Sequence, residues 1–225
     1  YRNQLAEQYL TDSDMNAALL QEAYDRKKEE VEVSHILVKI ADTGTAADTL
    51  AAYNKALSII KRAQKEDFAK LAKEVSDDQY ASKTGGYVGW VNALRTPYSF
   101  ENAAFATQAG SVSKPVRTFL GYHIIKVLDR RPSQGEVHVK HIFVLDNDPN
   151  STNKAELKAR IDSIYQRLKA GDDFGELAKK HSQDPGSARQ NGELPWFGSG
   201  QMIPEFEKAA FALKQEGEFT EPVHT

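Results

Sequence analysis

The 225-residue sequence has no cysteine, no run of 18 apolar residues and no block of like charge. The absence of cysteine excludes disulfides, thiolate metal sites and cysteine nucleophiles. Without a long apolar run, we expect no membrane span. Lys and Arg number 29 against 32 Asp and Glu, for a net charge of −3, so nothing favours nucleic acid or an anionic membrane as a partner.

The length of the chain allows one large or two small domains. It starts at Tyr1 without a methionine and stops at Thr225, so we expect a fragment of a longer protein. The lack of a visible signal peptide therefore says little about targeting. A chain without cysteine suits an oxidising compartment and equally the cytosol.

A short, β-branched, apolar run with a central histidine occurs twice, at residues 33–38 and 139–144. Side chains alternate between the two faces of a strand, so His35 and His141 each share a face with apolar neighbours two positions away. Taken alone, either histidine would be interpreted as a hydrogen-bonded polar group of the core.

The two histidines are 106 positions apart (141 − 35), and this offset recurs along the chain. It separates Phe68 from Phe174, Leu71 from Leu177, Asp78 from Asp184, Gly86 from Gly192, Trp90 from Trp196, Phe100 from Phe206 and Phe105 from Phe211. A period this long indicates two copies of a whole domain rather than a solenoid.

We expect four segments in the chain. Residues 1–30 form two helices, the tail of an upstream domain, of which the second has an apolar stripe. That stripe comprises Met15, Leu19, Leu20, Ala23 and Tyr24, and a charged run follows at 25–30. The first domain is 31–129, the linker 130–136, and the second domain 137–225, truncated at its C-terminal strand.

Within the first copy, the pattern predicts helices at 46–64, 67–72 and 100–105, a polar loop at 76–79 and a strand entered at 85–90. A closing hairpin is expected from 110–116 and 121–128, with His123, Ile125 and Val127 on one face. The first helix is expected to bury Leu50, Tyr53, Leu57 and Ile60, and its repeat Leu157, Ile161, Ile164 and Leu168. Strands separated by clustered helices indicate an α+β fold.

These landmarks together resemble the parvulin family of peptidyl-prolyl cis/trans isomerases. In order, they are Ser-His-Ile-Leu-Val at 34–38, Asp-Phe-Ala-x-Leu-Ala at 67–72, Ser-Asp-Asp at 76–78, Gly-Gly-x-x-Gly-Trp at 85–90, Phe-Glu-x-Ala-Ala-Phe at 100–105, Gly-x-Val-x-x-Pro-Val at 110–116 and Gly-Tyr-His-Ile-Ile-Lys at 121–126. Tandem parvulin domains after a helical segment resemble bacterial periplasmic folding factors of the SurA type.

The resemblance implies that each domain is a four-stranded antiparallel sheet wrapped by about four helices. It places His35 beside His123 under the active site, with Asp78 at the family's cysteine-or-aspartate position. In the second copy the corresponding residues are His141 and Asp184, and the second histidine is absent; His224 aligns with Arg117 instead. A purely structural histidine pair, and a merely solvated turn at Asp77-Asp78, remain alternatives.

The family's proline pocket is lined by a leucine, a methionine and a phenylalanine. The second copy has all three as Leu194, Met202 and Phe206. The first copy has Val88, Thr96 and Phe100, with Leu120 at the family's aromatic position before Gly-Tyr-His. Less apolar surface binds proline less well, at about 0.8 kcal/mol per lost buried CH₂. We therefore expect the second copy, when complete, to be the better isomerase.

The resemblance implies non-covalent isomerisation of X–Pro bonds in exported proteins, in the periplasm or cell envelope of a bacterium. Its partners would be unfolded or extended polypeptides and proline-containing peptides. The alternative is a parvulin-fold chaperone that holds unfolded chains with weak or no turnover. The residue types His, His and Asp could also bind a metal. The family chemistry explains them without one, so no metal or other cofactor is expected.

Overall fold

The computed structural model describes residues 13–41, 44–145 and 154–225. They form two compact units, of which the first ends at Ser133 and the second comprises Gln134–Thr225. This boundary lies inside the segment expected as a linker. The first of the two expected N-terminal helices lies outside the described residues. Among the helices that are described, none combines the length and apolar character needed to cross a membrane.

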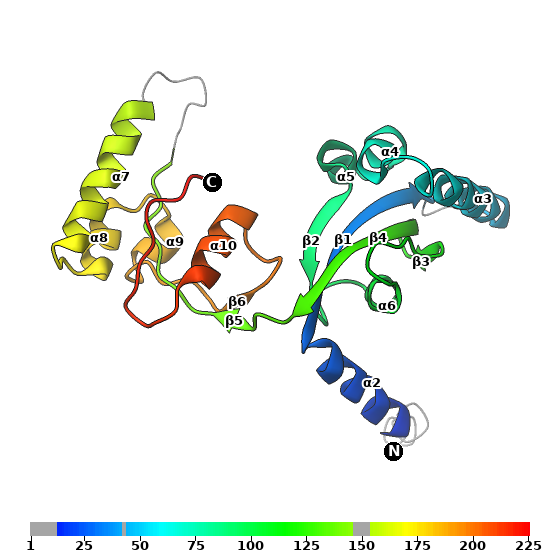
Figure 1. Cartoon of the computed structure of the whole chain (residues 1–225), viewed down its shortest axis with the longest axis horizontal. Helices are drawn as coiled ribbons and strands as arrows, with labels where there is room; N and C mark the ends of the chain where they lie inside the picture. The colour runs from blue at the N-terminus through cyan, green and yellow to red at the C-terminus, as the bar shows by residue number, and fades with distance from the viewer. Residues whose placement is uncertain (1–12, 42–43, 146–153) are drawn as a thin grey trace, which may run out of the picture. The chain divides into compact units, whose positions relative to one another are not determined.

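The first unit is built on a four-stranded antiparallel sheet (Figure 1). Its strands are β1 (Glu29–Lys39), β2 (Tyr87–Val91), β3 (Val116–Thr118) and β4 (Gly121–Pro132), in the spatial order β2-β1-β4-β3. The long central pair β1–β4 runs from the Glu29–Pro132 pair to the Lys39–Gly121 pair. This is the sheet that the sequence predicts for the first copy.

Helices cover both faces of this sheet. They are α2 (Ser13–Arg26), α3 (Ala46–Ala63), α4 (Phe68–Val75), α5 (Gln79–Thr84) and α6 (Tyr98–Ala106). On one face, Ile36, Val38 and Ile124 pack against α3 and α4. On the other, strand residues such as Val33 and Ile125 pack against α6. Strand alternation therefore places His35 of β1 on the α6 face together with Val33, and His123 of β4 together with Ile125 and Val127.

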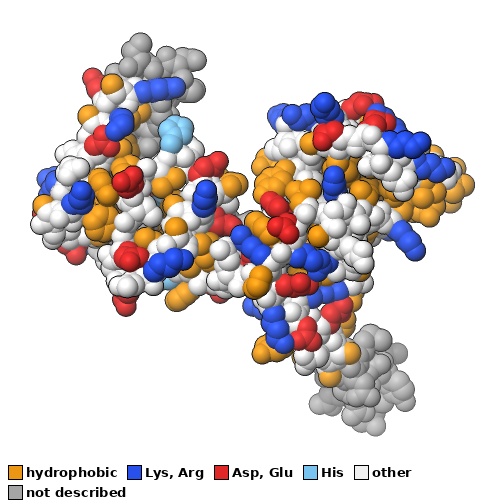
Figure 2. All heavy atoms as spheres, viewed as in Figure 1, with side chains coloured by type: hydrophobic (Ala, Val, Ile, Leu, Met, Phe, Trp, Pro, Cys, Tyr) orange, Lys and Arg blue, Asp and Glu red, His pale blue; other side chains and the backbone are white. Residues whose placement is uncertain are grey.

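The prediction for the buried face of α3 was wrong for three of its four residues; only Ile60 of the four packs, partly buried, against the core. Leu50 is 60 % exposed, and Tyr53 and Leu57 are also at the surface, whereas Ala52, Ala56 and Ile59 are buried. Small alanine side chains let the helix axis lie close to the sheet, so the larger residues fall at the margins. Figure 2 shows the resulting apolar surface over α3.

Three residues of the apolar stripe expected on the second N-terminal helix, Leu19, Leu20 and Tyr24, are also exposed. In α2, Leu20 is 72 % and Tyr24 62 % exposed, while Arg26 faces α6. The Arg26 Nη1 donates to Glu101 Oε1 at 3.1 Å, and its guanidinium lies 5.3 Å from the centre of the Phe105 ring. A buried carboxylate requires a cation, and this requirement sets which face of α2 packs inward.

The charged segments at both ends of the first unit belong to the sheet. Glu29 and Glu30, expected to end the N-terminal helix, begin β1, and Arg130 and Arg131, expected in the linker, lie in β4. Glu30 is fully buried and accepts from Arg131 Nε at 2.8 Å. The strands extend this far because a paired glutamate can be buried between them.

The second unit repeats the helices of the first. It comprises β5 (Glu136–Val137), α7 (Lys154–Lys169), α8 (Phe174–His181), α9 (Pro185–Ala188), β6 (Phe197–Gly198) and α10 (Pro204–Ala212). In α7, Ile164 is buried, as the sequence predicts. Asp173 caps α8 through the Glu176 N–H at 2.8 Å, as Asp67 caps α4 through Lys70 at 2.9 Å.

The sheet of the second unit has two strands, β5 and β6, in the described part of the chain. The four strands expected for each copy are therefore seen only in the first. In that unit β4 is the partner of β1 along its whole length, and the described residues 134–145 and 154–225 contain no counterpart of β4. The segment around His141 keeps its other contact: His141 N–H donates to Gly192 O at 2.8 Å, as His35 N–H does to Gly86 O.

Candidate functional site

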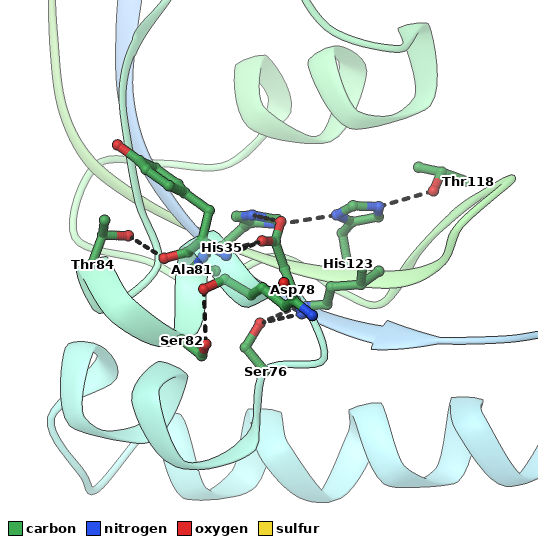
Figure 3. A network of polar contacts seen from close by, with 11 residues as sticks. His35, Ser76, Asp78, Ala81, Ser82, Thr84, Thr118 and His123 are labelled. Atoms are coloured by element: carbon green, nitrogen blue, oxygen red, sulfur yellow. Dashed lines mark hydrogen bonds and ion pairs between the residues drawn. The ribbon is translucent and has the colours of Figure 1, made fainter. Parts of the chain in front are cut away.

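His35 and His123 form a pair on the α6 face of the first sheet (Figure 3). They lie on adjacent antiparallel strands, where Leu37 is the register partner of His123. Their Nδ1 atoms are 3.1 Å apart, and the rings stack at 18° with centroids 5.3 Å apart. The structure thus brings together the two histidines that the sequence placed on one face of two different strands.

Asp78 lies at the His35 end of this pair. It is the N-cap of α5, and its Oδ1 accepts from the N–H groups of Tyr80 at 2.8 Å and Ala81 at 3.1 Å. Its Oδ2 is 3.3 Å from His35 Nε2. The capping role fixes the carboxylate, because an N-cap side chain satisfies the first free amides of the helix.

Thr118 lies at the other end, and the sequence analysis missed it. Its Oγ1 is 2.9 Å from His123 Nε2 and accepts from the Leu120 N–H at 3.2 Å. Thr118 pairs with Gly121 in the β3–β4 hairpin, so only two residues form the turn between them. A turn this short, recognised in the sequence, would have placed Thr118 beside the start of β4. The expected hairpin ended its first strand at residue 116, two positions too early to include the threonine.

The electrostatics of the site keep both rings neutral at neutral pH. Burial lowers the pKa of His35 and lowers that of His123 to about 4, where repulsion from His35 adds to the effect, and Asp78 only partly offsets it. Partial burial raises the pKa of Asp78, but the N–H groups of Ala81 and Tyr80, with His35, bring it below its usual value. Desolvation thus decides the charge state of the histidines.

Because both rings are neutral, the direction of each hydrogen bond between Thr118, His123, His35 and Asp78 is fixed. The Asp78 carboxylate can only accept, so His35 carries its proton on Nε2 and offers Nδ1 as an acceptor. His123 then donates from Nδ1 to His35 and accepts at Nε2 from the Thr118 hydroxyl. The row Thr118–His123–His35–Asp78 is therefore a chain of donors that ends on one carboxylate.

Phe100 is the residue of the expected first-copy proline pocket that contacts the histidines. Its ring is 5.9 Å from His35 and 5.5 Å from His123, edge-on to both. Val88 is 41 % and Leu120 39 % exposed, so both present apolar surface to solvent. The Thr96 Oγ1 is buried without a hydrogen-bond partner in the described structure.

The second unit brings His141 and Asp184 together. His141 Nε2 is 2.8 Å from Asp184 Oδ2, and its ring lies edge-on to Phe206 at 5.9 Å. Asp184 caps α9 through the Gly186 N–H at 3.0 Å. Of the other pocket residues, Met202 is half-buried, and Leu194 donates its N–H to Val139 O at 3.0 Å.

Ser187 joins this pair, and sequence reasoning missed it as well. Its hydroxyl donates to Asp184 Oδ2 at 2.5 Å, and its Oγ is 2.9 Å from His141 Nε2. Hydrogen bonds from Ser187 first, and then from His141, lower the pKa of Asp184 to about 2. The first unit has Ala81 at this position, so the comparison of the two copies is the signal that could have revealed it.

Ser187, His141 and Asp184 do not form a hydrolytic triad. In such a triad the serine and the carboxylate contact opposite nitrogens of the imidazole. Here the serine and the aspartate both contact Nε2 of His141, and the serine hydroxyl donates its proton to the carboxylate in a hydrogen bond. No group of three or more His, Cys, Asp or Glu side chains with metal-binding geometry occurs in residues 13–41, 44–145 and 154–225.

The fold is that of a parvulin-type domain, and comparison with known families agrees. The PpiC-type peptidyl-prolyl isomerase (PPIase) domain matches residues 19–131, about half of the chain, and a second model of the same description matches 141–225. The chain belongs to the PpiC-type PPIase domain family, with two such domains in tandem.

The chain is also similar to the chaperone SurA of several bacteria. It is 33 % identical over 202 residues to that of Pseudomonas fluorescens, covering 88 % of this chain and 46 % of the relative. To SurA of Methylobacillus flagellatus it is 37 % identical over 204 residues, with 88 % and 46 % covered. The chain thus spans about half the length of these relatives.

Among solved structures, the peptidylprolyl isomerase PrsA of Bacillus anthracis is 24 % identical, with a TM-score of 0.41 over 76 % of this chain and 61 % of that one.

Proposed function

We propose that this chain is the tandem-isomerase part of a folding factor and that it catalyses cis/trans isomerisation of X–Pro bonds in client polypeptides. The observation that carries the proposal is the neutral histidine pair, held between Thr118 and Asp78 and edge-on to Phe100. We further propose 31–129 and 137–225 as the two domains, with 130–136 as the segment that connects them; within it, residues 130–132 extend β4 and Glu136 begins β5.

The proposed chemistry needs no bond between protein and substrate. X–Pro rotation has a barrier of about 18–20 kcal/mol because amide resonance must be lost in the twisted state. A catalyst binds that twisted state more tightly than the planar amide. Lowering the barrier by about 5 kcal/mol would accelerate rotation roughly 10³–10⁴-fold. Preorganised polar groups beside an apolar ring pocket supply this kind of stabilisation.

The roles follow from the hydrogen-bond directions. In the first unit we assign His35, His123 and Asp78 to the polar row that faces the twisted amide. In the second unit His141 and Asp184 take these roles. Proline would lie on the apolar residues, which are Val88, Thr96, Phe100 and Leu120 in the first unit and Leu194, Met202 and Phe206 in the second.

The two units should differ in activity. The first has the histidine partner, but its pocket has Thr96 in place of a methionine, and the Thr96 hydroxyl is buried without a hydrogen-bond partner among the described residues. The second has the apolar set, but no second histidine contacts His141 in residues 134–145 and 154–225. We propose that the second unit, when its sheet is complete, is the better isomerase and that the first mainly binds chains.

A second candidate function is chaperone-like holding of extended polypeptides, with weak or no turnover. The exposed apolar side chains favour it: Phe119 is 76 % exposed, and Leu120, next to it in the β3–β4 turn, 39 %. The relatives that match most of the chain carry the name chaperone. With this function we propose a location in the bacterial periplasm or cell envelope and unfolded proteins as clients.

Two assays on the same chain separate these functions. Isomerisation of a proline peptide is followed by exchange NMR, and suppression of aggregation is measured on an unfolded, proline-free client. An isomerase accelerates the first and a pure holding protein affects only the second. Absence of acceleration by this chain, and by one extended past Thr225, would refute the isomerase.

A further inference from the structure

We propose that Ser187 is a positioning residue of the second unit: its hydroxyl locks the Asp184 carboxylate against His141 and thereby holds the His141 proton on Nε2. The importance of Ser187 for catalysis rests on the proposed isomerase function. The position of the proton on the His141 ring can be measured whether or not the chain is an isomerase. The first unit lacks this serine, since Ala81 occupies the equivalent place.

The contacts around Ser187 form a closed triangle. Ser187 Oγ, Asp184 Oδ2 and His141 Nε2 are separated by 2.5, 2.8 and 2.9 Å. Ser187 is 3 % exposed, so water does not compete for its hydroxyl. Because the carboxylate accepts from the serine hydroxyl, the oxygen of that hydroxyl is free to accept from His141 Nε2–H alongside Asp184.

The first unit serves as an internal comparison. Asp78 caps α5 as Asp184 caps α9, but Ala81 has no hydroxyl. The distance from Asp78 Oδ2 to His35 Nε2 is 3.3 Å, against 2.8 Å for Asp184 and His141. His35 has a different support, because its Nδ1 meets the Nδ1–H of His123. One copy thus holds its strand histidine from the Nδ1 side, and the other holds it from the Nε2 side.

The consequence is a shared tautomer reached by two routes. In each unit the strand histidine carries its proton on Nε2 and leaves the Nδ1 lone pair as an acceptor. In the first unit a donor histidine enforces this, and in the second the serine–aspartate pair does. A charge-assisted hydrogen bond contributes about 1.5–3 kcal/mol, which is at least tenfold in an equilibrium constant.

The test is NMR spectroscopy of the whole chain. The ¹⁵N shifts of the His141 ring report its tautomer, and the ¹³C shift of the Asp184 carboxyl reports its titration. Ser187→Ala should raise the proton affinity of Asp184 about tenfold and reduce the Nε2–H fraction of His141. The reciprocal Ala81→Ser should lower the proton affinity of Asp78, because it supplies the missing hydroxyl.

Ser182→Ala is the matched control. Ser182 Oγ accepts from the backbone N–H of Phe143 at 3.1 Å and of Asp184 at 3.4 Å, and neither of these hydrogen bonds involves the His141 ring. This variant loses a serine at the same turn and should leave the His141 tautomer as it is. An equal tautomer change in Ser182→Ala and Ser187→Ala would overturn the proposal, since general loosening of the turn would then explain both.

Unchanged Asp184 titration and His141 tautomer in Ser187→Ala would likewise overturn it. If Ser187→Ala does not fold, Ala81→Ser provides the test. An unchanged titration of the Asp78 carboxyl in Ala81→Ser would then overturn the role of the hydroxyl. Expected NMR changes in a chain without isomerase activity would support the positioning role and refute the proposed function, so the two failures are distinguishable.

Discussion

Acid should destabilise the first unit in a defined pH window through His123. Burial first, and then repulsion from His35, lower its pKa from 6.5 to about 4 in the folded state. In the unfolded chain the ring binds a proton near pH 6.5, so the unfolded state takes up protons first as the pH falls. The stabilisation from the neutral ring is therefore complete above pH 6.5, and it is lost progressively between 6.5 and 4.

The magnitude follows from the width of this window. A shift of one pKa unit corresponds to 1.36 kcal/mol, so the 6.5-to-4 interval gives a loss of about 3 kcal/mol in the free energy of unfolding. His35, whose pKa is also lowered chiefly by burial, adds in the same direction. The carboxyl of Asp78 contributes only below its ordinary pKa of 3.8, outside this window.

The assay is urea unfolding at several pH values, followed by tryptophan fluorescence. Each unit has one tryptophan, so a Trp196→Phe background leaves Trp90 as the reporter of the first unit. His123→Asn removes the titrating ring and should flatten the pH dependence between 6.5 and 4. A first unit equally stable at both ends of the window would refute the claim that the His123 ring is neutral and desolvated.

Three other substitutions test the surroundings of the site. Thr96→Val removes the buried hydroxyl for which the described part of the chain offers no hydrogen-bond partner, and it should stabilise the first unit by about 1 kcal/mol in urea unfolding; a loss of stability would show that the hydroxyl is satisfied. Gly121→Ala would drive a Cβ into Val38 O and should abolish the Thr118–His123 contact in NMR spectra, whereas Gly110→Ala meets nothing within 4 Å, adds only the backbone strain of its positive φ and should keep that contact. Arg131→Ala removes the guanidinium that donates to the fully buried Glu30 and should cost about 3 kcal/mol in the same unfolding assay; a neutral outcome would contradict the importance of this ion pair.

The repeat and strand alternation made much of the fold predictable from the sequence. A fixed offset of 106 residues located two copies, and the alternation of β1 and β4 put His35 and His123 on the α6 face. Asp67 and Asp173 begin matching helices because an aspartate N-cap is a local signal. Local rules were enough wherever the deciding interaction lies within a few residues.

The wrong predictions concern helix faces chosen by tertiary contacts. Apolar spacing in α3 pointed to Leu50 and Leu57, but close approach to the sheet selected Ala52 and Ala56. In α2, the buried partner of Arg26 is Glu101, which lies 75 residues away. An ion pair between residues so far apart in the sequence cannot be predicted from the spacing of apolar residues within the helix.

The missing members of the site have a similar cause. Thr118 reaches His123 only because the hairpin turn is as short as it is, and Ser187 reaches His141 only because Asp184 begins a helix one turn earlier. Neither contact is visible as a spacing rule. Both depend on the direction of a hydroxyl that the backbone geometry sets.

The most direct test of the central claim is the rate of X–Pro isomerisation by the chain and by its histidine variants. The account predicts that His35→Gln and His141→Gln each remove part of the acceleration and that the double variant removes nearly all of it. His181→Gln, which changes a half-buried histidine at the end of α8, should leave the rate unchanged. A double variant as active as the unmodified chain would contradict the account, because catalysis would then not depend on the strand histidines.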